Sequence, residues 1–155
     1  MGPQNNGPLM LDPSLQSLAI QAHVFATLFM TGVVWFVQVV HYPFFNFAAA
    51  QTRTEAAGFH QRRTSYVVLP VMIVELVTAV TLLGSSWMTR YGETILINLG
   101  LLLLTWVITF SRFMPLYKEL SRGFDSTLIK ALESANWVRT SLWTVRSVVL
   151  ISFLN

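Results

Sequence analysis

The chain contains no cysteine and unusually little charge. Without cysteine, disulfides, thiolate metal sites and cysteine nucleophiles are all excluded. Charged residues make up 11% of the 155 residues and hydrophobic residues 54%, whereas a soluble domain carries about 25% charged residues. This composition predicts an integral membrane protein. The formal net charge of +3 does not indicate nucleic-acid binding, because the basic residues flank apolar runs.

Common catalytic and metal-binding motifs are also missing from the sequence. It has no glycine-rich phosphate loop, no GxSxG elbow and no paired-carboxylate motif. None of the three histidines forms an i,i+4 pair, so we predict no metal site and no cofactor. Ligation of a metal or haem by His41 and His60 stays open as an alternative, because both fall near the same predicted membrane surface.

Four apolar stretches approach the ~20 residues that a membrane-spanning helix needs. They predict one all-α domain over residues 15–155, an integral membrane four-helix bundle that follows a mobile N-terminal tail (1–14). The predicted spans are residues 18–40, 64–83, 94–113 and 136–154.

The connections between the spans carry their own signals. Thr52–Glu55 fits a capping box, which predicts a short helix from Arg53 towards the second span. After a turn at 123–126, Leu128 and Leu132 at i,i+4 spacing predict an amphipathic helix that leads into the fourth span. Both are expected to be interfacial helices on the cytoplasmic side. Proline lacks an amide donor, so Pro43 is expected to end or kink the first span and Pro70 to kink the second.

Basic residues fall almost entirely on one side of the predicted bundle. The other side has only Arg90, and short loops rich in Lys and Arg stay cytoplasmic. We therefore expect a multi-pass protein of the bacterial inner (plasma) membrane with both termini on the non-cytoplasmic side. The eight basic residues on the cytoplasmic side are Arg53, Arg62, Arg63, Arg112, Lys118, Arg122, Lys130 and Arg139.

Two charged residues stand in the middle of apolar runs. A rise of 1.5 Å per residue puts Glu75 and Arg146 roughly 15 Å from the inner surface, level with Thr31 and Thr105. A lone charge at that depth costs roughly 2.5–3.5 kcal/mol, which predicts that the two pair. A second, cation-rich layer is expected nearer the cytoplasm, with His23 in neither layer. This second layer consists of Gln38, His41, Thr109, Arg112, Asn136 and Arg139.

The two layers contain more positive than negative charge, and this excess allows two interpretations of the polar seam. The Glu75–Arg146 pair can be purely structural, whereas the unmatched Arg139 calls for a bound anion, a polarised oxygen or water; Arg112 is expected to reach the headgroups. The candidate catalytic residues are Arg139, which with Arg146 would stabilise an oxyanion, and Glu75 or His41, which would move a proton. The candidate ligand-binding residues are Gln38, Thr31, Thr105, Asn136, Thr140, Trp143, Arg146 and Tyr117.

Two functions follow from these interpretations. The first is binding, and possible oxidation, of a lipophilic, partly polar small molecule in a polar seam between the helices. The alternative is a non-catalytic structural or accessory subunit whose basic face docks a partner membrane protein or anionic lipid. Ala22 and Ala26 allow a homo-oligomeric helix contact.

Several segments resemble a known group of proteins. Gln38-Val-Val-His-Tyr-Pro43, Pro70-Val-Met-Ile-Val-Glu75 and Asn136-Trp-Val-Arg-Thr140 resemble small bacterial four-span membrane proteins over roughly residues 15–150. The second half is also similar to the membrane superfamily that includes the anthrone oxygenases.

The resemblance implies a four-helix membrane fold. For the characterised branch it implies oxidation of an anthrone to a quinone by O2 without an evident metal. Asn136, Arg139 and Thr140 match that branch, but Tyr117 stands where it has asparagine and where the bacterial group often has histidine. A phenol, an amide and an imidazole are not interchangeable donors.

Overall fold

The structure is a computed structural model that describes residues 12–45, 52–85, 87–123 and 125–154. Within these ranges every regular element is helical, which confirms the all-α class. Two π-helical turns join successive α-helices, η1 (Val37–His41) after α1 and η2 (Thr109–Phe113) after α4. The α-helices are α1 (Pro13–Phe36), α2 (Tyr42–Phe44), α3 (Arg53–Leu83), α4 (Trp87–Ile108), α5 (Met114–Leu120) and α6 (Ser126–Leu154).

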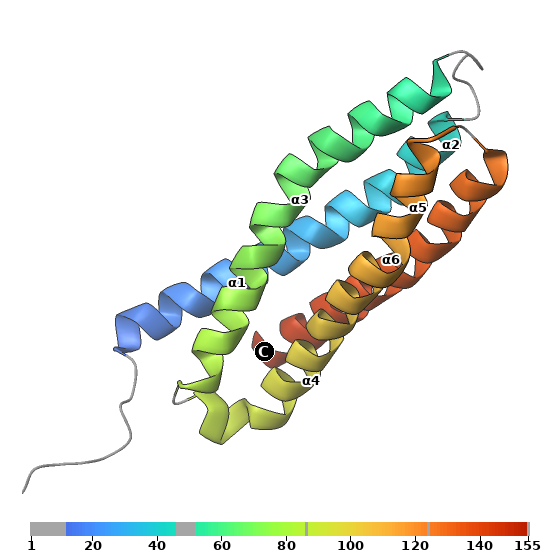
Figure 1. The fold of residues 1–155 in the computed structure, drawn as a ribbon. Helices are drawn as coiled ribbons and strands as arrows, with labels where there is room; N and C mark the ends of the chain where they lie inside the picture. Colours follow the sequence, from blue (N-terminus) through green and yellow to red (C-terminus); the bar gives the residue numbers. More distant parts are fainter. Residues whose placement is uncertain (1–11, 46–51, 86, 124, 155) are drawn as a thin grey trace, which may run out of the picture.

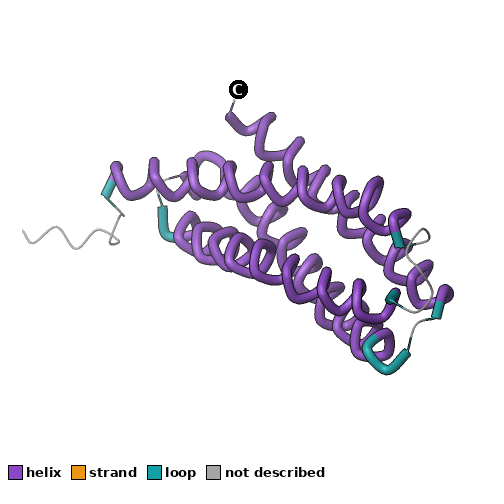
Figure 2. The backbone as a smooth tube through the Cα atoms, turned by 90° about the horizontal axis from the view of Figure 1, so that it is seen from above, coloured by secondary structure: helices purple, strands orange, loops and turns teal. Residues whose placement is uncertain are grey.

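The long helices α1, α3, α4 and α6 run up and down beside one another (Figure 1). Helix α1 packs on α3 and α6, and α4 packs on the same two helices. The start of α1 and the end of α6 lie at one end of the molecule, and α2 and α5 lie at the other (Figure 1). Figure 2 shows the same arrangement from above, with helix along nearly the whole described chain.

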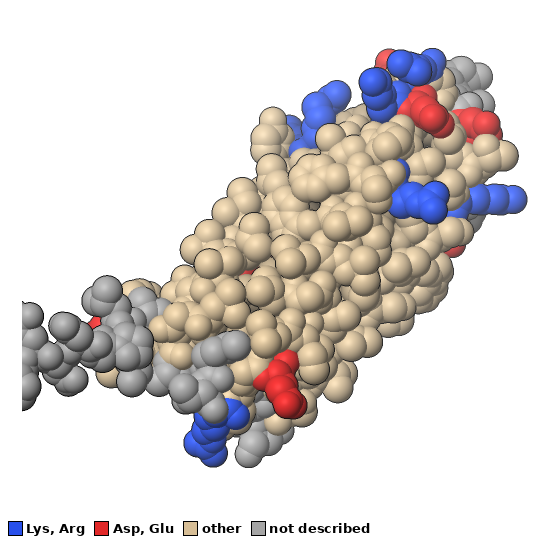
Figure 3. Space-filling model, turned by 60° about the horizontal axis from the view of Figure 1, so that its bottom comes forward, with Lys and Arg blue, Asp and Glu red and all other residues tan. Residues whose placement is uncertain are grey.

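Three helical segments are long and apolar enough to cross a membrane: Pro13–Phe44, Thr54–Leu83 and Arg90–Leu120. Helix α6 is not among them, because Arg139, Arg146 and several amide and hydroxyl side chains lower its hydropathy. Figure 3 shows charged side chains gathered towards the two ends of the molecule, with a largely uncharged band between them.

Prolines explain the two π-helical turns. A proline has no N–H to give to the carbonyl four residues earlier, and its ring collides with that carbonyl. Just before Pro43, the Tyr42 amide instead bonds to the Val37 carbonyl, five residues back. Before Pro115, the Met114 amide bonds to the Thr109 carbonyl in the same way. The first span is therefore widened at Pro43 rather than ended.

The third irregularity lies in α3. Pro70 is inside this helix, and Figure 1 shows that α3 changes direction near its middle. The bend predicted at Pro70 is therefore present. The widened turn before Pro115 was not predicted.

The predicted short helices before the second and fourth spans are not separate elements. Residues from Arg53 onward form the first turns of α3, and residues from Ser126 onward form those of α6. No proline lies between Arg53 and Leu69 or anywhere in α6, so nothing interrupts either helix at the predicted span boundary. A short helix instead forms as α5, where Pro115 breaks the α-helical pattern.

Helix α1 begins two residues before the end of the predicted N-terminal tail. Pro13 and Ser14 already belong to α1, because the Asp12 carboxylate accepts hydrogen bonds from the amides of Ser14 and Leu15 at 2.8 and 3.4 Å. Hydrogen bonds from the Ser14 hydroxyl and amide hold the pKa of Asp12 below its usual range. Residues 1–11 lie outside the described residues.

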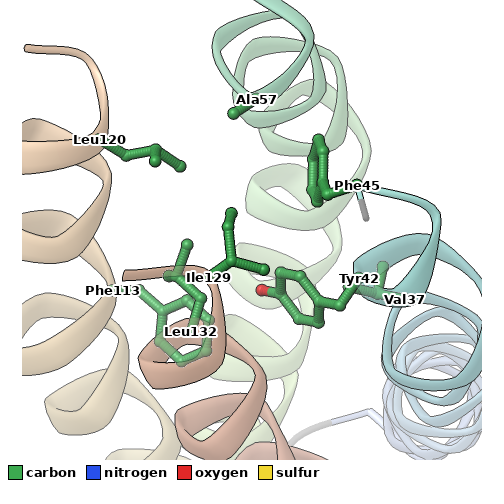
Figure 4. Packing of buried hydrophobic residues seen from close by; sticks show 8 residues of the cluster. All are labelled: Val37, Tyr42, Phe45, Ala57, Phe113, Leu120, Ile129 and Leu132. Carbon is green, nitrogen blue, oxygen red and sulfur yellow. The ribbon is translucent and has the colours of Figure 1, made fainter. Parts of the chain in front are cut away.

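Apolar side chains fill the end of the molecule near α2 and α5. Figure 4 shows eight of them, and among these Tyr42 turns its phenol oxygen inward, towards Phe113 and Leu132. This core holds the ends of α1, α4 and α6 together beside the cavity described below. Its members are Val37, Tyr42, Phe45, Ala57, Phe113, Leu120, Ile129 and Leu132.

Candidate functional site

Glu75 of α3 and Arg146 of α6 form the ion pair that the sequence predicts. The Arg146 Nη1 lies 2.8 Å from the Glu75 Oε1, and both side chains are fully buried. The Thr27 hydroxyl donates to the same oxygen at 2.8 Å, and the Trp143 indole N–H lies 3.2 Å from both carboxylate oxygens. The carboxylate therefore has donors from both α1 and α6.

The remaining donors of Arg146 extend the network to α4. Its Nε donates to the Asn98 Oδ1 at 3.2 Å, and its Nη2 donates to the Thr27 Oγ1 at 3.3 Å. The Asn98 Nδ2 returns a bond to the Arg146 carbonyl at 3.3 Å. All four long helices thus meet in one network with one positive and one negative charge. This is the condition under which a buried ion pair is tolerated.

His23 belongs to this layer, contrary to the sequence-based prediction. Its Nε2 lies 3.2 Å from the Asn98 Oδ1, and its Nδ1 lies 2.9 Å from the Thr78 hydroxyl. An amide oxygen can only accept, so Nε2 carries the proton. Depth counting along straight, parallel helices misplaced α1 by one turn, so the pair contacts Thr27 rather than Thr31.

Thr31 and Thr105 lie outside the network. The Thr31 hydroxyl is 2.7 Å from the Ser147 hydroxyl and donates to the Trp143 carbonyl at 3.1 Å. The Thr105 hydroxyl donates to the Leu102 carbonyl of its own helix at 2.6 Å. Thr31 therefore joins α1 to α6, whereas the Thr105 hydroxyl bonds within α4.

A second set of hydrogen bonds joins α6 to the widened turn η1. The Asn136 Nδ2 donates to the Gln38 Oε1 at 2.9 Å and to the Val34 carbonyl at 3.3 Å. The Thr140 hydroxyl lies 3.5 Å from that carbonyl. Both residues of α6 thus reach the Val34 carbonyl just before the π-turn, and Asn136 also reaches the Gln38 side chain within it.

A cavity of about 290 Å³ lies between α3 and the η2–α5 segment, with α1 and α6 behind it. Three of the segments that line it each contain or adjoin a proline-associated irregularity: η1 before Pro43, η2 before Pro115, and α3, which contains Pro70. Widened π-turns are often found at functional sites. The polar side chains in the lining include Tyr42, His60, Thr64, Tyr117, Asn136 and Arg139.

Arg139 is the charged group in this lining. It is 8% exposed, and its guanidinium carbon lies 4.5 Å from the Phe113 ring centroid and 5.1 Å from that of Trp143. Among the described residues no carboxylate forms an ion pair with it, and its Nε has no hydrogen-bond partner. The two aromatic contacts supply no oxygen acceptor, so Arg139 differs sharply from Arg146.

Two phenols accompany Arg139. Tyr42 and Tyr117 are the titratable side chains close enough to act on it electrostatically. Their hydroxyl oxygens lie 3.5 Å apart, which is too long for a strong mutual hydrogen bond. Both hydroxyls therefore retain hydrogen-bonding capacity towards the cavity.

His41 lies apart from Arg139. Its ring stacks on that of His60 with centroids 3.7 Å apart and planes at 23°, and it lines a wider hollow on the other side of His60 rather than the cavity. Stacked imidazoles direct their in-plane nitrogens sideways and do not converge on one metal ion. The described residues contain no group of three or more His, Asp or Glu side chains that could hold a metal.

The predicted site residues are thus divided among different places. The cavity contains Tyr117, Asn136 and Arg139, whereas Glu75 is engaged by Arg146 and His41 lies behind His60. Of the other predicted ligand-binding residues, Thr105 has its hydroxyl bonded within its own helix. The rest form hydrogen bonds between helices: Thr31, Gln38, Thr140, Trp143 and Arg146.

Sequence reasoning missed Tyr42, His60 and Thr64 as cavity residues. The available signals were the proline directly after Tyr42 and the i,i+4 spacing of His60 and Thr64, whose side chains lie 3.0 Å apart.

Comparisons of the chain with protein-family models, with curated proteins and with solved structures found no match. The interpretation of the site therefore depends on its geometry. The two buried arginines of α6, Arg139 and Arg146, differ in whether they have a counter-ion, and we therefore expect their substitutions to affect stability in opposite ways.

Arg146→Met should strongly destabilise the protein, because it leaves the Glu75 carboxylate buried without its partner. We expect a loss of roughly 3–5 kcal/mol in the free energy of unfolding, measured by denaturant titration in mild detergent. The double variant Glu75→Met/Arg146→Met should recover most of the loss, since both charges are then removed. If the double variant is no more stable than Arg146→Met, the pair is not the source of the effect.

Arg139→Met should behave in the opposite way. A buried guanidinium without a counter-ion is costly, and two ring contacts offset only part of that penalty, so the variant should gain roughly 1 kcal/mol. The exposed Arg112→Met is the matched control and should change stability by less than about 0.5 kcal/mol. A loss of stability in Arg139→Met as large as that in Arg146→Met would show that Arg139 has a structural partner.

Proposed function

We propose that this chain is a multi-pass membrane protein that binds a lipophilic, partly polar molecule in the cavity beside Arg139. Three apolar helical segments and the uncharged band between two charged ends support the membrane location (Figure 3). The helices hold the polar groups inside the molecule and turn Leu, Val, Ile and Phe outward.

Helix α6 completes a four-helix bundle in this proposal. Its polar residues Asn136, Arg139 and Arg146 are buried, whereas Val145 and Val148 on other faces are exposed. A polar stripe turned towards neighbouring helices is how charged residues occur in membrane spans. The low overall hydropathy of α6 is therefore compatible with a spanning helix inside the bundle.

The end that carries α2 and α5 is the cytoplasmic end in this proposal. Exposed basic residues cluster there, whereas Arg90 lies at the other end. The bias places both termini on the non-cytoplasmic side and offers a surface for anionic lipid. The basic residues at the cytoplasmic end include Arg62, Arg63, Lys118, Arg122 and Lys130.

The observation that carries the binding proposal is the buried Arg139 without a counter-ion. The Glu75–Arg146 pair is satisfied within the protein and needs no ligand, so the structural interpretation fits that pair. Arg139 instead lines an apolar cavity together with two phenols. A ligand oxygen in the cavity would satisfy the guanidinium, and the same group would stabilise an oxyanion if the ligand reacts.

Binding can be tested with the full chain in mild detergent and a panel of lipophilic probes that carry different polar ends: dodecanol, a decyl-substituted benzoquinone and dodecanoate. At least one probe should bind saturably, and Arg139→Gln should weaken it at least tenfold because the guanidinium anchors its oxygen. Arg112→Gln, which removes an exposed arginine of η2 outside the cavity lining, should bind like the unaltered protein.

Native mass spectrometry counts the bound probe directly. If no probe binds saturably, or if Arg139→Gln and Arg112→Gln bind equally well, the binding proposal is wrong. A stable complex with another membrane protein and no bound small molecule would then favour the accessory-subunit alternative.

A further inference from the structure

We infer that the occupant of the cavity is a single-chain amphiphile with a carboxylate head, held by Arg139, Tyr42 and Tyr117, whose tail leaves between α3 and η2–α5 into the bilayer. This inference rests on the proposed function and adds the chemical class of the ligand and its direction of entry.

The charge of the cavity selects the head group. Arg139 is the cation in the described lining, and the lining contains no acidic residue. A neutral carbonyl or hydroxyl would accept a hydrogen bond but leave the guanidinium charge uncompensated in an apolar surrounding. A monoanion cancels the charge, whereas a dianionic phosphate would bring a second charge that no other cation of the lining matches.

The geometry of the donors also fits a carboxylate. A guanidinium presents parallel N–H groups that match the two oxygens of a carboxylate. The hydroxyls of Tyr42 and Tyr117 lie beside it, and their mutual hydrogen bond of 3.5 Å is weak enough to be exchanged for a bond to a third group. Charge-assisted hydrogen bonds of this kind are the strong ones in protein interiors.

The cavity opens sideways towards the region where lipid would lie. Leu69 of α3, Phe110 of η2 and Met114 of α5 line it and are 48%, 57% and 53% exposed, respectively. Its volume of about 290 Å³ is at the lower end of the usual range for ligand pockets. The head and the first part of an acyl chain fit inside, and the apolar opening lets the rest of the tail continue into the bilayer.

A basic residue lies on the rim of this opening. A shallow hollow between α3 and α5 shares Gln61, Met114 and Tyr117 with the cavity and continues to Lys118. A positive side chain at the mouth raises the local concentration of anions. Lys118 and Arg139 together mark a path for an anionic head from the basic end of the molecule to the cavity.

The test measures binding of four probes to the full protein in mild detergent by native mass spectrometry. The probes share a saturated alkyl chain and differ in the head group: dodecanoate, dodecanol, dodecyl phosphate and a decyl-substituted benzoquinone. Dodecanoate should bind one per chain and at least tenfold more tightly than each of the others. Arg139→Gln should abolish this preference, and Tyr117→Phe should reduce dodecanoate binding severalfold without changing dodecanol binding.

Three further variants control for the loss of an arginine elsewhere, for the width of the opening, and for the charge at position 139. Arg112→Gln should bind dodecanoate normally. Leu69→Trp, which narrows the opening without touching the polar groups, should weaken dodecanoate binding while Arg139 remains in place. Arg139→Lys keeps the positive charge but loses the two parallel N–H donors of the guanidinium. It should therefore bind dodecanoate with an intermediate affinity, and it keeps the test possible even if Arg139→Gln fails to fold.

The outcomes separate this inference from the proposed function. If the benzoquinone or dodecanol binds in an Arg139-dependent way and dodecanoate binds no better, the carboxylate inference is wrong and the binding proposal stands. If dodecyl phosphate binds most tightly, the head group is a phosphate and the inference is again wrong. If no probe binds saturably, both fail.

Discussion

The whole fold depends on how the Glu75 carboxylate is satisfied. A buried ion is tolerated only when a counter-charge lies nearby and its hydrogen-bonding atoms have partners. Here Thr27 and Trp143 donate to the carboxylate, Arg146 forms an ion pair with it, and Asn98 holds the guanidinium from a fourth helix. Any rotation or slide of one helix would break several of these bonds at once. The network therefore fixes the register of all four long helices, which apolar packing alone specifies poorly.

Helix α6 presents two arginines in opposite situations. Arg139 and Arg146 are seven residues apart, about two turns, and so lie on the same face of the helix. Arg146 has its counter-charge within the protein, whereas Arg139 meets aromatic rings and phenols. Trp143 lies between them, donating its indole N–H to Glu75 and covering Arg139 with its ring. Trp143 thus connects the structural network to the arginine that lines the cavity.

The sequence predicts most of the fold because apolar run length and charge content respond to the same physical constraint, the exclusion of charge from an apolar environment. It also predicts the Glu75–Arg146 pair, since each charge is intolerable alone. The cavity was not predictable in the same way. Its shape arises from helix irregularities at Pro43, Pro70 and Pro115 that rotate and displace whole turns, and depth counting assumes regular helices. The same assumption misplaced His23 and brought Thr31 too close to the pair.

The measurement that tests the central claim most directly is hydrogen exchange of the arginine Nε–H groups, followed by NMR on the ligand-free protein in detergent micelles. The Arg146 Nε–H donates to Asn98 and the Arg139 Nε–H has no partner among the described residues. Exchange should therefore be slow at Arg146 and much faster at Arg139. Equal protection of the two groups would show that Arg139 has a hydrogen-bond acceptor within the protein. It would contradict the claim that the Arg139 guanidinium lacks one when no ligand is bound.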